Sequence, residues 1–368
     1  MSTLARENDA INLSQGFPNF NCDYELRKKV EIAMKKGFNQ YAPMQGLAQL
    51  REQIARMIGI CYGVSYDPAT EITVTSGATE ALLCAVMALV KEGDEVIVIE
   101  PAYDSYLPAI ELSGGIPVCI SLSFPDYRID WEQVKRLINH RTRAIILNSP
   151  HNPTGTILQD SDLRTLAQLI SDKEIYVISD EVYEHIIYDG QSHASVAQYP
   201  ELAARSFIIS SFGKSLHATG WKVGYCVAPP FLTNEFRKIH QYVTFSTSTP
   251  FQFAIADYLE NNFEKIIGLK SFYQKKRDFF LQHMEGSAFE PIASSGTYFQ
   301  LMRYHAISDE PDQAFAERLT KEFGVAAIPI SVFYRNETDH RVVRFCFAKE
   351  DETLEKATER LRQIQPRD

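Results

Sequence analysis

Lys214 lies in the segment SFGKSLHATGWKVG, residues 211–224, within a run of small residues. Ser211 precedes Lys214 by three positions, and a second cation, Lys222, follows it by eight. An amine whose neighbours lower its pKa becomes a nucleophile and can form a Schiff base with an aldehyde. The segment therefore predicts an enzyme that uses a bound aldehyde cofactor, with Ser211 and Lys222 able to bind phosphate oxygens.

A glycine-containing turn could hold that phosphate. The segment SGATEAL, residues 76–82, follows an apolar run and opens a helical pattern. Gly77 permits a tight turn, and the amides of Ala78 and Thr79 would lie at the positive end of the helix, where phosphate binds. Taken alone, the motif fits an ordinary strand-to-helix turn equally well.

Two more segments carry an amide, an acid and a phenol. In NSPHNPTG, residues 148–155, prolines on both sides of Asn152 restrict the backbone, so the amide suits a ligand oxygen. In SDEVY, residues 179–183, Asp180 ends an apolar run and Tyr183 follows three residues later. A buried acid requires a partner. Each motif alone could instead be a proline-rich turn or a helix N-cap.

The elements that position these motifs alternate between apolar β-branched runs and amphipathic stretches such as residues 79–93 and 160–173. This alternation predicts an α/β fold whose large domain has a mainly parallel seven-stranded sheet between helices. Sites in such sheets gather at the carboxyl ends of the strands, where all the motifs above lie. The predicted strands are residues 71–76, 95–100, 116–121, 143–149, 174–180, 206–211 and 224–229.

The pattern changes after residue 250. A long helical stretch, 252–284, precedes two apolar strands at 296–302 and 341–348, which predicts a smaller α+β domain. We expect residues 35–255 to form the large domain and residues 1–34 to join residues 256–368 in the small one.

The overall composition excludes several classes of protein. The 368 residues carry a net charge of −10, which argues against a nucleic-acid surface. No apolar run is long enough for a membrane span, and the N-terminus has no targeting character. The six cysteines never form CxxC, which favours buried free thiols and a cytoplasmic location. No metal site is predicted. The first motif follows closely on the N-terminus, which is compatible with a short missing upstream segment.

One ligand satisfies the whole set of groups, namely pyridoxal 5′-phosphate. Its ring nitrogen needs a carboxylate, its ring oxygen O3′ needs donors, its phosphate needs amides, a hydroxyl and a cation, and its aldehyde needs a lysine. In order and spacing the motifs resemble those of the class I aminotransferases, the fold type I pyridoxal-phosphate enzymes. The segments SQGFPNF, PHNPTG, SDEVYEH, SFGKSLHATGWKVGY and RFCFAK are similar to the methionine, kynurenine and glutamine-phenylpyruvate aminotransferase branch, from about residue 11 to the C-terminus.

This resemblance implies a role for each cofactor-binding residue. Lys214 would form the Schiff base, Asp180 would pair with the ring nitrogen, and Tyr103 would stack on the ring. Many family members carry arginine where this chain has Lys222, so its grip on phosphate would be that of a point charge. Asn152 and Tyr183 would hold O3′, and the phosphate ligands would be Gly77, Ala78, Thr79, Ser211 and Lys222.

The resemblance also implies a substrate clamp and a homodimer with shared active sites. Arg344, in an apolar strand, would bind the substrate carboxylate together with Asn152 and the backbone at Gly16. An ion pair between Arg344 and a protein acid is the alternative. Tyr41 would reach the phosphate of the partner subunit, and Phe245 would line the partner's substrate pocket.

The predicted activity is a ping-pong transfer of an amino group to a 2-oxo acid. Lys214, once freed from the aldehyde, would take the α-proton of the substrate and return it to the cofactor. An aromatic pocket with few cations favours methionine, aromatic amino acids or glutamine over aspartate. Two alternatives remain open: a cysteine-conjugate C–S β-lyase with the same residues, and a non-catalytic regulatory protein on the same fold.

Overall fold

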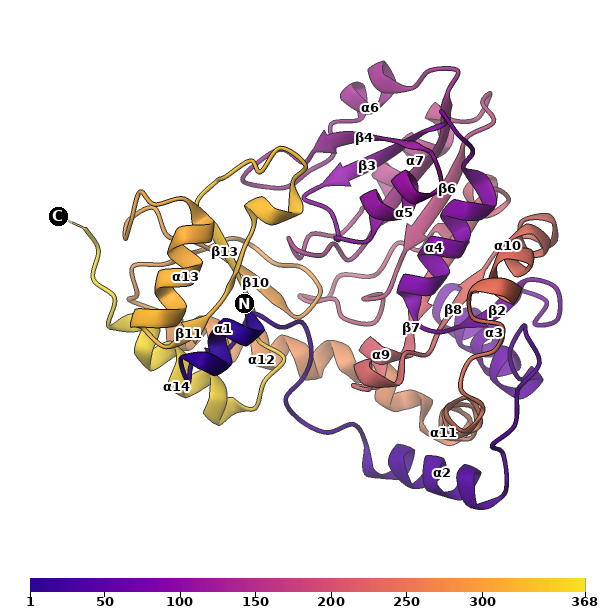
Figure 1. The fold of residues 1–368 in the computed structure, drawn as a ribbon, viewed down its shortest axis with the longest axis horizontal. Helices are drawn as coiled ribbons and strands as arrows, with labels where there is room; N and C mark the ends of the chain where they lie inside the picture. Colours follow the sequence, from indigo (N-terminus) through magenta and orange to yellow (C-terminus); the bar gives the residue numbers. More distant parts are fainter. Residues whose placement is uncertain (368) are drawn as a thin grey trace.

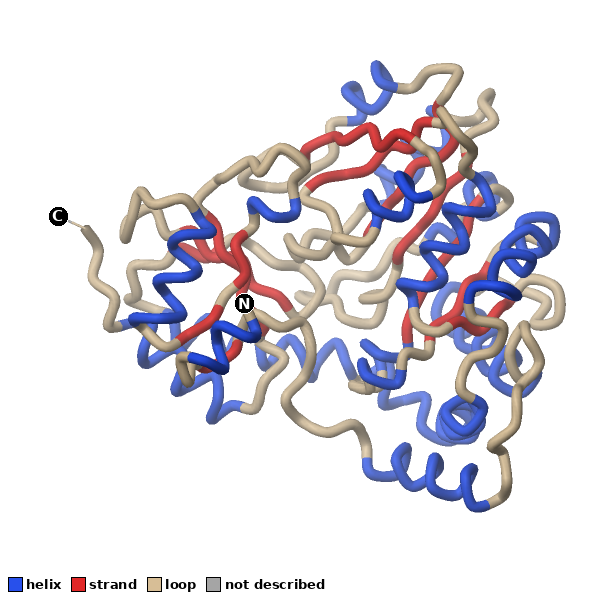
Figure 2. The backbone as a smooth tube through the Cα atoms, viewed as in Figure 1, coloured by secondary structure: helices blue, strands red, loops and turns tan. Residues whose placement is uncertain are grey.

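The seven apolar runs form one sheet, in the order β2-β8-β7-β6-β5-β3-β4 (Figure 1 and Figure 2). This computed structural model describes residues 1–367. β8 is antiparallel to β2 and β7, and all other pairings are parallel, so the predicted α/β fold is confirmed. The strands are β2 (Ile72–Thr75), β3 (Glu95–Glu100), β4 (Ile116–Ser121), β5 (Thr142–Asn148), β6 (Tyr176–Asp180), β7 (Ser206–Ser211) and β8 (Gly224–Val227).

Successive side chains of the central strands enter two different hydrophobic cores, one on each face of the sheet. In β3, Val96 and Val98 belong to one core, whereas Ile97 and Ile99 belong to the other. A strand buried on both faces must be apolar at every position, because successive side chains point to opposite faces. This requirement explains why the runs are continuously apolar rather than alternating.

Helices cover both faces and supply the rest of these cores. One core contains residues of α4 (Ala78–Leu89), α5 (Tyr106–Leu112) and α10 (Pro230–Val243). The opposite core receives side chains from α3 (Ala48–Tyr62), α6 (Trp131–Leu137), α7 (Asp160–Leu169) and α8 (Pro200–Ala203). α4 follows β2 after only two residues, and its Ala- and Leu-rich sequence favours a helix.

The remaining elements surround a four-stranded antiparallel sheet, β12-β13-β10-β9. The long helical stretch predicted for residues 252–284 is two helices, α11 (Thr249–Ile267) and α12 (Leu269–Met284). The other elements of this region are β9 (Glu290–Pro291), β10 (Phe299–Arg303), α13 (Asp312–Glu322), β11 (Val325–Ala326), β12 (Ile328–Pro329), β13 (Val342–Cys346) and α14 (Asp351–Arg362).

The N-terminal segment packs against this C-terminal region. β1 (Ile11–Asn12) pairs with β11, and α1 (Ser2–Glu7) contacts α13, so the indigo helix lies among orange and yellow elements in Figure 1. α2 (Tyr24–Lys35) instead packs against α11. The grouping of the N-terminal residues with the small domain stays a prediction. The division after residue 255 stays a prediction, and α11 continues through that position.

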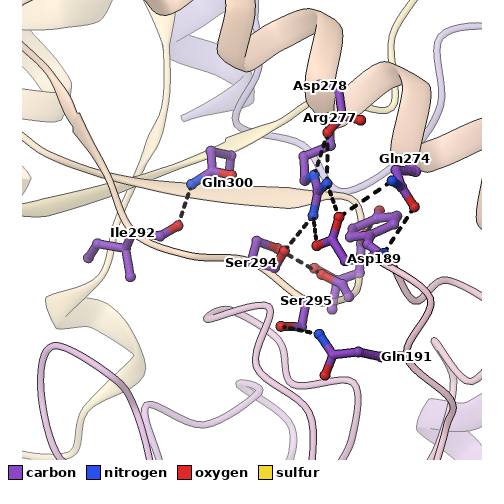
Figure 3. A network of polar contacts seen from close by, with 12 residues as sticks. Asp189, Gln191, Gln274, Arg277, Asp278, Ile292, Ser294, Ser295 and Gln300 are labelled. Carbon is purple, nitrogen blue, oxygen red and sulfur yellow. Dashed lines mark hydrogen bonds and ion pairs between the residues drawn. The ribbon is translucent and has the colours of Figure 1, made fainter.

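A polar network joins the two sheet regions (Figure 3). Arg277 of α12 forms two hydrogen bonds of 2.7 Å with the Asp189 carboxylate and donates to the Ser294 carbonyl at 3.0 Å. The amides of Ser295 and Gly296 donate to the Gly155 carbonyl, at 2.8 Å each. A bidentate guanidinium–carboxylate pair fixes orientation as well as distance. The network therefore holds the 148–155 segment against the chain that leads into β10.

All six cysteines are free thiols, as predicted, but only Cys84, Cys226 and Cys346 are buried, whereas Cys22, Cys61 and Cys119 are partly exposed. Among the described residues, no helix combines the length and the apolar character that crossing a bilayer would require.

Candidate active site

A cavity of about 120 Å³ lies where β5, β6 and β7 end and α4 begins. A larger cavity of about 630 Å³ borders it at Asn148 but contains none of the predicted site residues. Ten of the predicted residues line the smaller cavity: Gly77, Ala78, Thr79, Tyr103, Asn152, Asp180, Tyr183, Ser211, Lys214 and Lys222.

The start of α4 and the turn before β8 form one end of this cavity. Gly77 has φ +80°, in the left-handed region that favours glycine, and it is the N-cap of α4. Lys222, with φ +53°, lies so close that a methyl group on Gly77 would be 3.2 Å from Lys222 Cε. Gly224 permits this approach, since a methyl group there would lie 2.9 Å from the Ala78 nitrogen. Helix amides, an ammonium group and Ser211 at one end of a cavity suit an anion.

Asn148, at the end of β5, organises the amide and acid of the site. Its amide nitrogen donates to the Asp180 carbonyl at 2.9 Å, and its Oδ1 accepts from the Asn152 amide at 2.8 Å. One side chain thus joins the ends of two neighbouring strands and sets the backbone of the NSPHNPTG turn. Sequence reasoning missed Asn148, because its role depends on the pairing of β5 with β6.

Asp180 is a buried carboxyl with two hydrogen-bond donors. The Tyr106 hydroxyl donates to Asp180 Oδ2 at 2.6 Å, and the Val182 amide donates to Oδ1 at 3.3 Å. Burial raises the pKa of the Asp180 carboxyl to about 6, although both hydrogen bonds and the charge of Lys214 act to lower it. A cation on the cavity side would offset the burial and keep the carboxyl ionised. Sequence reasoning missed Tyr106, which lies in α5.

Lys214 Nζ is enclosed by two tyrosine rings. It lies 5.3 Å from the ring centroid of Tyr183 and 5.5 Å from that of Tyr298. Its one hydrogen bond to a described side chain goes to the Tyr298 hydroxyl, at 3.0 Å. Burial lowers the pKa of the Lys214 amine from its ordinary value of 10.5 to about 8. Near neutral pH the amine can therefore both lose and regain a proton, as a nucleophile and general base requires.

Arg344 lies beside the cavity, and one of its guanidinium nitrogens, Nε, has no partner in the described part of the protein. Its Nη1 donates to Asn152 Oδ1 at 2.6 Å, and its Nη2 donates to the Ser14 carbonyl at 3.4 Å. The guanidinium stacks on Phe299 at 3.9 Å. Its Nε is buried and has no hydrogen-bond partner among residues 1–367. A carboxylate could accept from this edge, and the ion pair with a protein acid that the sequence left open is not formed with any described residue.

The structure does not bring the last predicted residues into the cavity of a single chain. Gly16 is linked to it indirectly, because the Tyr298 hydroxyl donates to the Gly16 carbonyl at 2.6 Å. Tyr41 and Phe245 lie on the surface, with side chains 83% and 38% exposed and ring centroids 5.3 Å apart. Both residues were predicted to serve a partner subunit, and that role stays a prediction.

Together these groups fit pyridoxal 5′-phosphate and an amino acid. The buried carboxyl, the low-pKa lysine and the anion-binding end line one cavity, and these are the groups that the ring nitrogen, aldehyde and phosphate of that cofactor would require. The unpaired Arg344 donor lies beyond Asn152, where a substrate carboxylate would follow. The arrangement is suited to proton transfer next to a carboxylate-bearing carbon.

Comparison with known proteins agrees with this geometry. The family described as aminotransferase class I and II matches residues 8–361. Methionine aminotransferase of Escherichia coli (strain K12) is 50% identical over 364 residues, covering 99% of this chain and 94% of the relative. A kynurenine–oxoglutarate transaminase of Dictyostelium discoideum is 36% identical, covering 98% of this chain and 92% of the relative.

Solved structures show the same fold over almost the full length. The crystal structure of the Escherichia coli methionine aminotransferase has a TM-score of 0.97 at 50% identity, covering 99% of this chain and 95% of that one. N-succinyldiaminopimelate aminotransferase of Mycobacterium tuberculosis has a TM-score of 0.96 at 38% identity, covering 99% and 96%. The protein is therefore an enzyme that transfers amino groups, and it belongs to the aminotransferase class I and II family.

Proposed function

We propose that this aminotransferase binds pyridoxal 5′-phosphate in the 120 Å³ cavity and moves the amino group of methionine or a similar apolar or aromatic amino acid to a 2-oxo acid. The proposal is based on three groups that meet around one cavity. They are the buried low-pKa amine of Lys214, the buried carboxyl of Asp180 and the guanidinium of Arg344, whose Nε has no hydrogen-bond partner among the described residues. These groups come from β6, β13 and α9 (Phe212–Ser215), the short helix that follows β7.

Each residue of the cavity has a defined task in this proposal. The amides of α4, with Ser211 and Lys222, bind the phosphate, and Tyr103 covers the ring. Asp180 holds the proton on the ring nitrogen, aided by its own hydrogen bond from Tyr106. When bound, pyridoxal phosphate supplies an electron sink for the electron pair left after loss of the α-proton.

Lys214 is the proposed proton carrier. As a neutral amine its Nζ accepts the α-proton of the substrate, and as an ammonium it returns the proton. Arg344 binds the substrate carboxylate through its free edge, while Asn152 keeps the guanidinium in place. Fixing the carboxylate fixes the position of the α-carbon relative to Nζ, which converts proton transfer into a step between positioned groups.

The donor class follows from the charges around the cavity. The lysines that line it, Lys214 and Lys222, both have tasks at the cofactor, and Arg344 serves the α-carboxylate. No lining side chain is left to neutralise a second carboxylate, so an apolar or aromatic donor is favoured over aspartate. Relatives named for methionine and kynurenine support this class.

We further propose a cytoplasmic homodimer that shares its active sites. The exposed pair Tyr41 and Phe245, which is apolar and lies outside the cavity, supports a partner that buries it. The six free cysteines support a reducing compartment.

The test uses purified protein with added cofactor. We expect a visible absorption band, and amino transfer to a 2-oxo acid with methionine as a better donor than aspartate. Lys214→Ala should lose both the band and the turnover. A variant that kept both, or a wild-type enzyme with aspartate as its best donor, would contradict the proposal.

Neither alternative is favoured, since the relatives named above are aminotransferases. A product assay distinguishes them directly. Aminotransfer yields the 2-oxo acid of the donor, whereas β-elimination from a cysteine conjugate yields pyruvate and ammonia. A protein without catalysis would yield neither.

A further inference from the structure

The Tyr298 hydroxyl is the direct link between the catalytic amine and the N-terminal substrate loop, residues 14–17. It accepts a hydrogen bond from Lys214 Nζ at 3.0 Å and donates one to the Gly16 carbonyl at 2.6 Å. Because its proton is committed to the carbonyl, its oxygen lone pairs face the amine. The Tyr298 side chain is fully buried, so the bridge forms in surroundings where hydrogen bonds are strong.

Packing leaves the Tyr298 ring little freedom. Its centroid lies 5.1 Å from that of Tyr183 and 4.9 Å from that of Phe299, both edge to face. Tyr273 packs on it from α12 at 5.6 Å. A ring held on three sides presents its hydroxyl in one place. The position of Lys214 Nζ therefore depends on a ring that belongs to the chain entering β10.

The substrate loop is held through its backbone carbonyls. Lys349 Nζ donates to the Phe17 carbonyl at 2.7 Å and to the Gln15 carbonyl at 3.4 Å. The Arg344 guanidinium reaches Ser14, as described above. Gly16 itself lies so close to Phe299 that a methyl group on it would be 2.9 Å from the ring carbon Cζ. Of the side chains that anchor this loop, Tyr298 is the one that also contacts the proton carrier.

We propose that Tyr298 is a positioning residue for aminotransfer, which couples the placement of the Gly16 substrate loop to the orientation of the Lys214 amine. The inference rests on the function proposed above, in which Lys214 carries the proton, and on the role in binding the substrate carboxylate that the family resemblance implies for the backbone at Gly16. A loop that moves away from Phe299 would release the Tyr298 proton from the Gly16 carbonyl. The hydroxyl could then turn, and Lys214 Nζ would lose its fixed acceptor.

Tyr298→Phe tests the bridge, because it keeps the ring and removes the hydroxyl. The matched control is Tyr273→Phe, since the Tyr273 hydroxyl is equally buried but has no hydrogen-bond partner among residues 1–367. With methionine and a 2-oxo acid, we expect kcat of Tyr298→Phe to fall about tenfold, the usual effect of one lost hydrogen bond. KM should change less than kcat, and Tyr273→Phe should resemble the wild type in both.

A second readout does not depend on activity. In cofactor-free protein, the rate at which Lys214 reacts with an amine-specific reagent, followed by mass spectrometry at several pH values, reports the pKa of its amine. The wild type should show a midpoint of about 8. Loss of the hydroxyl acceptor destabilises the ammonium form, so Tyr298→Phe should lower the midpoint by about one unit. The other titratable groups acting on the amine, namely Asp180, Lys222, Arg344 and Cys346, are unchanged in both variants.

The coupling is tested from the loop side by Gly16→Ala, which must move the loop away from Phe299. It should shift the Lys214 midpoint in the same direction as Tyr298→Phe. A Gly16→Ala midpoint equal to that of the wild type would overturn the coupling. So would a Tyr298→Phe enzyme that matches Tyr273→Phe in kcat and midpoint. If the wild type itself bound no cofactor, the proposed function would fail instead.

Discussion

At the scale of single residues, the site combines two groups whose pKa values burial moves toward each other. The Asp180 carboxyl is raised to about 6 and the Lys214 amine is lowered to about 8. Without a ligand, burial makes both the Asp180 carboxylate and the Lys214 ammonium unfavourable. A ligand that supplies an opposite charge stabilises the carboxylate, and a ligand that supplies the reacting proton gives the amine its catalytic role. Such a site is expected to cost stability in return for function.

Asp180→Asn should therefore stabilise the cofactor-free protein at pH 8. The folded pKa of Asp180 lies above its ordinary value of 3.8, so stability from the protonated form is present below pH 3.8 and lost as the pH rises through 6. Asparagine avoids this loss because it carries no charge. The free energy of unfolding of Asp180→Asn should exceed that of the wild type by on the order of 2–3 kcal/mol at pH 8 and by less at pH 5. Urea unfolding at the two pH values measures it.

The same substitution should weaken cofactor binding and abolish most turnover, because an amide cannot hold the proton on the ring nitrogen. Asp312→Asn is the control, since Asp312 is a buried acid in α13 with a raised pKa and a hydrogen bond to Ser331. It should leave cofactor binding unchanged. An Asp180→Asn protein less stable than the wild type at pH 8 would show that burial does not destabilise the Asp180 carboxylate in the cofactor-free protein.

Arg344→Lys should raise KM for the amino acid and the 2-oxo acid about a hundredfold, because an ammonium cannot bind a carboxylate through two parallel hydrogen bonds. Cofactor affinity should change little. Arg303→Lys, on the neighbouring strand β10, is the control, because Arg303 pairs with Glu290. Steady-state kinetics with both substrates varied gives the comparison, and equal effects of the two substitutions would argue against a carboxylate clamp.

At the scale of elements, the phosphate end depends on how closely β8 approaches α4. Gly224→Ala would place a methyl group 2.8 Å from the Ser210 carbonyl oxygen and 2.9 Å from the Ala78 nitrogen, and backbone atoms cannot move aside easily. We expect a loss of about 1–3 kcal/mol in unfolding free energy. Cofactor affinity should fall as well, because the displaced amides belong to the cradle.

Gly220→Ala is the matched control for this element. Gly220 lies four residues earlier in the same segment, and a methyl group there would meet no atom within 4 Å. Urea unfolding and cofactor titration of both variants measure the effect of each added methyl group on stability and on cofactor affinity. Equal stability and equal cofactor affinity in the two variants would show that the approach of β8 is not what shapes the cradle.

The sequence predicted those elements whose signal is local. Continuous apolar runs located all seven strands of the sheet. The motifs at strand ends identified nine residues that line one cavity, and the family resemblance added Tyr103. Tyr106, Asn148 and Tyr298 could not be found in this way, because their partners are distant in sequence. Asn148, for example, reaches Asp180 only because β5 pairs with β6. Such contacts follow from strand order, which single-sequence patterns do not encode.

At the scale of the whole molecule, a single chain leaves part of the predicted site on its surface. Tyr41 and Phe245 lie on the surface with their rings in contact, and Tyr242, near the end of α10, is 89% exposed. We expect light scattering to show a dimer of twice the 41.8 kDa chain mass. Tyr242→Asp should weaken the dimer, and cofactor affinity should fall as the dimer dissociates into single chains.

Leu112→Asp is the control for Tyr242→Asp, because Leu112 is equally exposed but lies on α5. It should leave the mass and the cofactor affinity unchanged. A wild-type protein that stays monomeric at micromolar concentration and binds cofactor fully would contradict the shared site.

The pairing of β2 with β8 also constrains how the enzyme can be made in a cell. β2 emerges early from the ribosome, yet its partner strand β8 is synthesised long afterwards. Arg344 and Lys349, which hold the N-terminal loop of residues 14–17, are synthesised later still. A nascent chain therefore exposes β2 as an unpaired strand edge and cannot assemble the phosphate cradle until β8 has emerged. Cofactor loading is consequently expected to follow the synthesis of β8, and products truncated before β8 would remain unloaded and prone to aggregation.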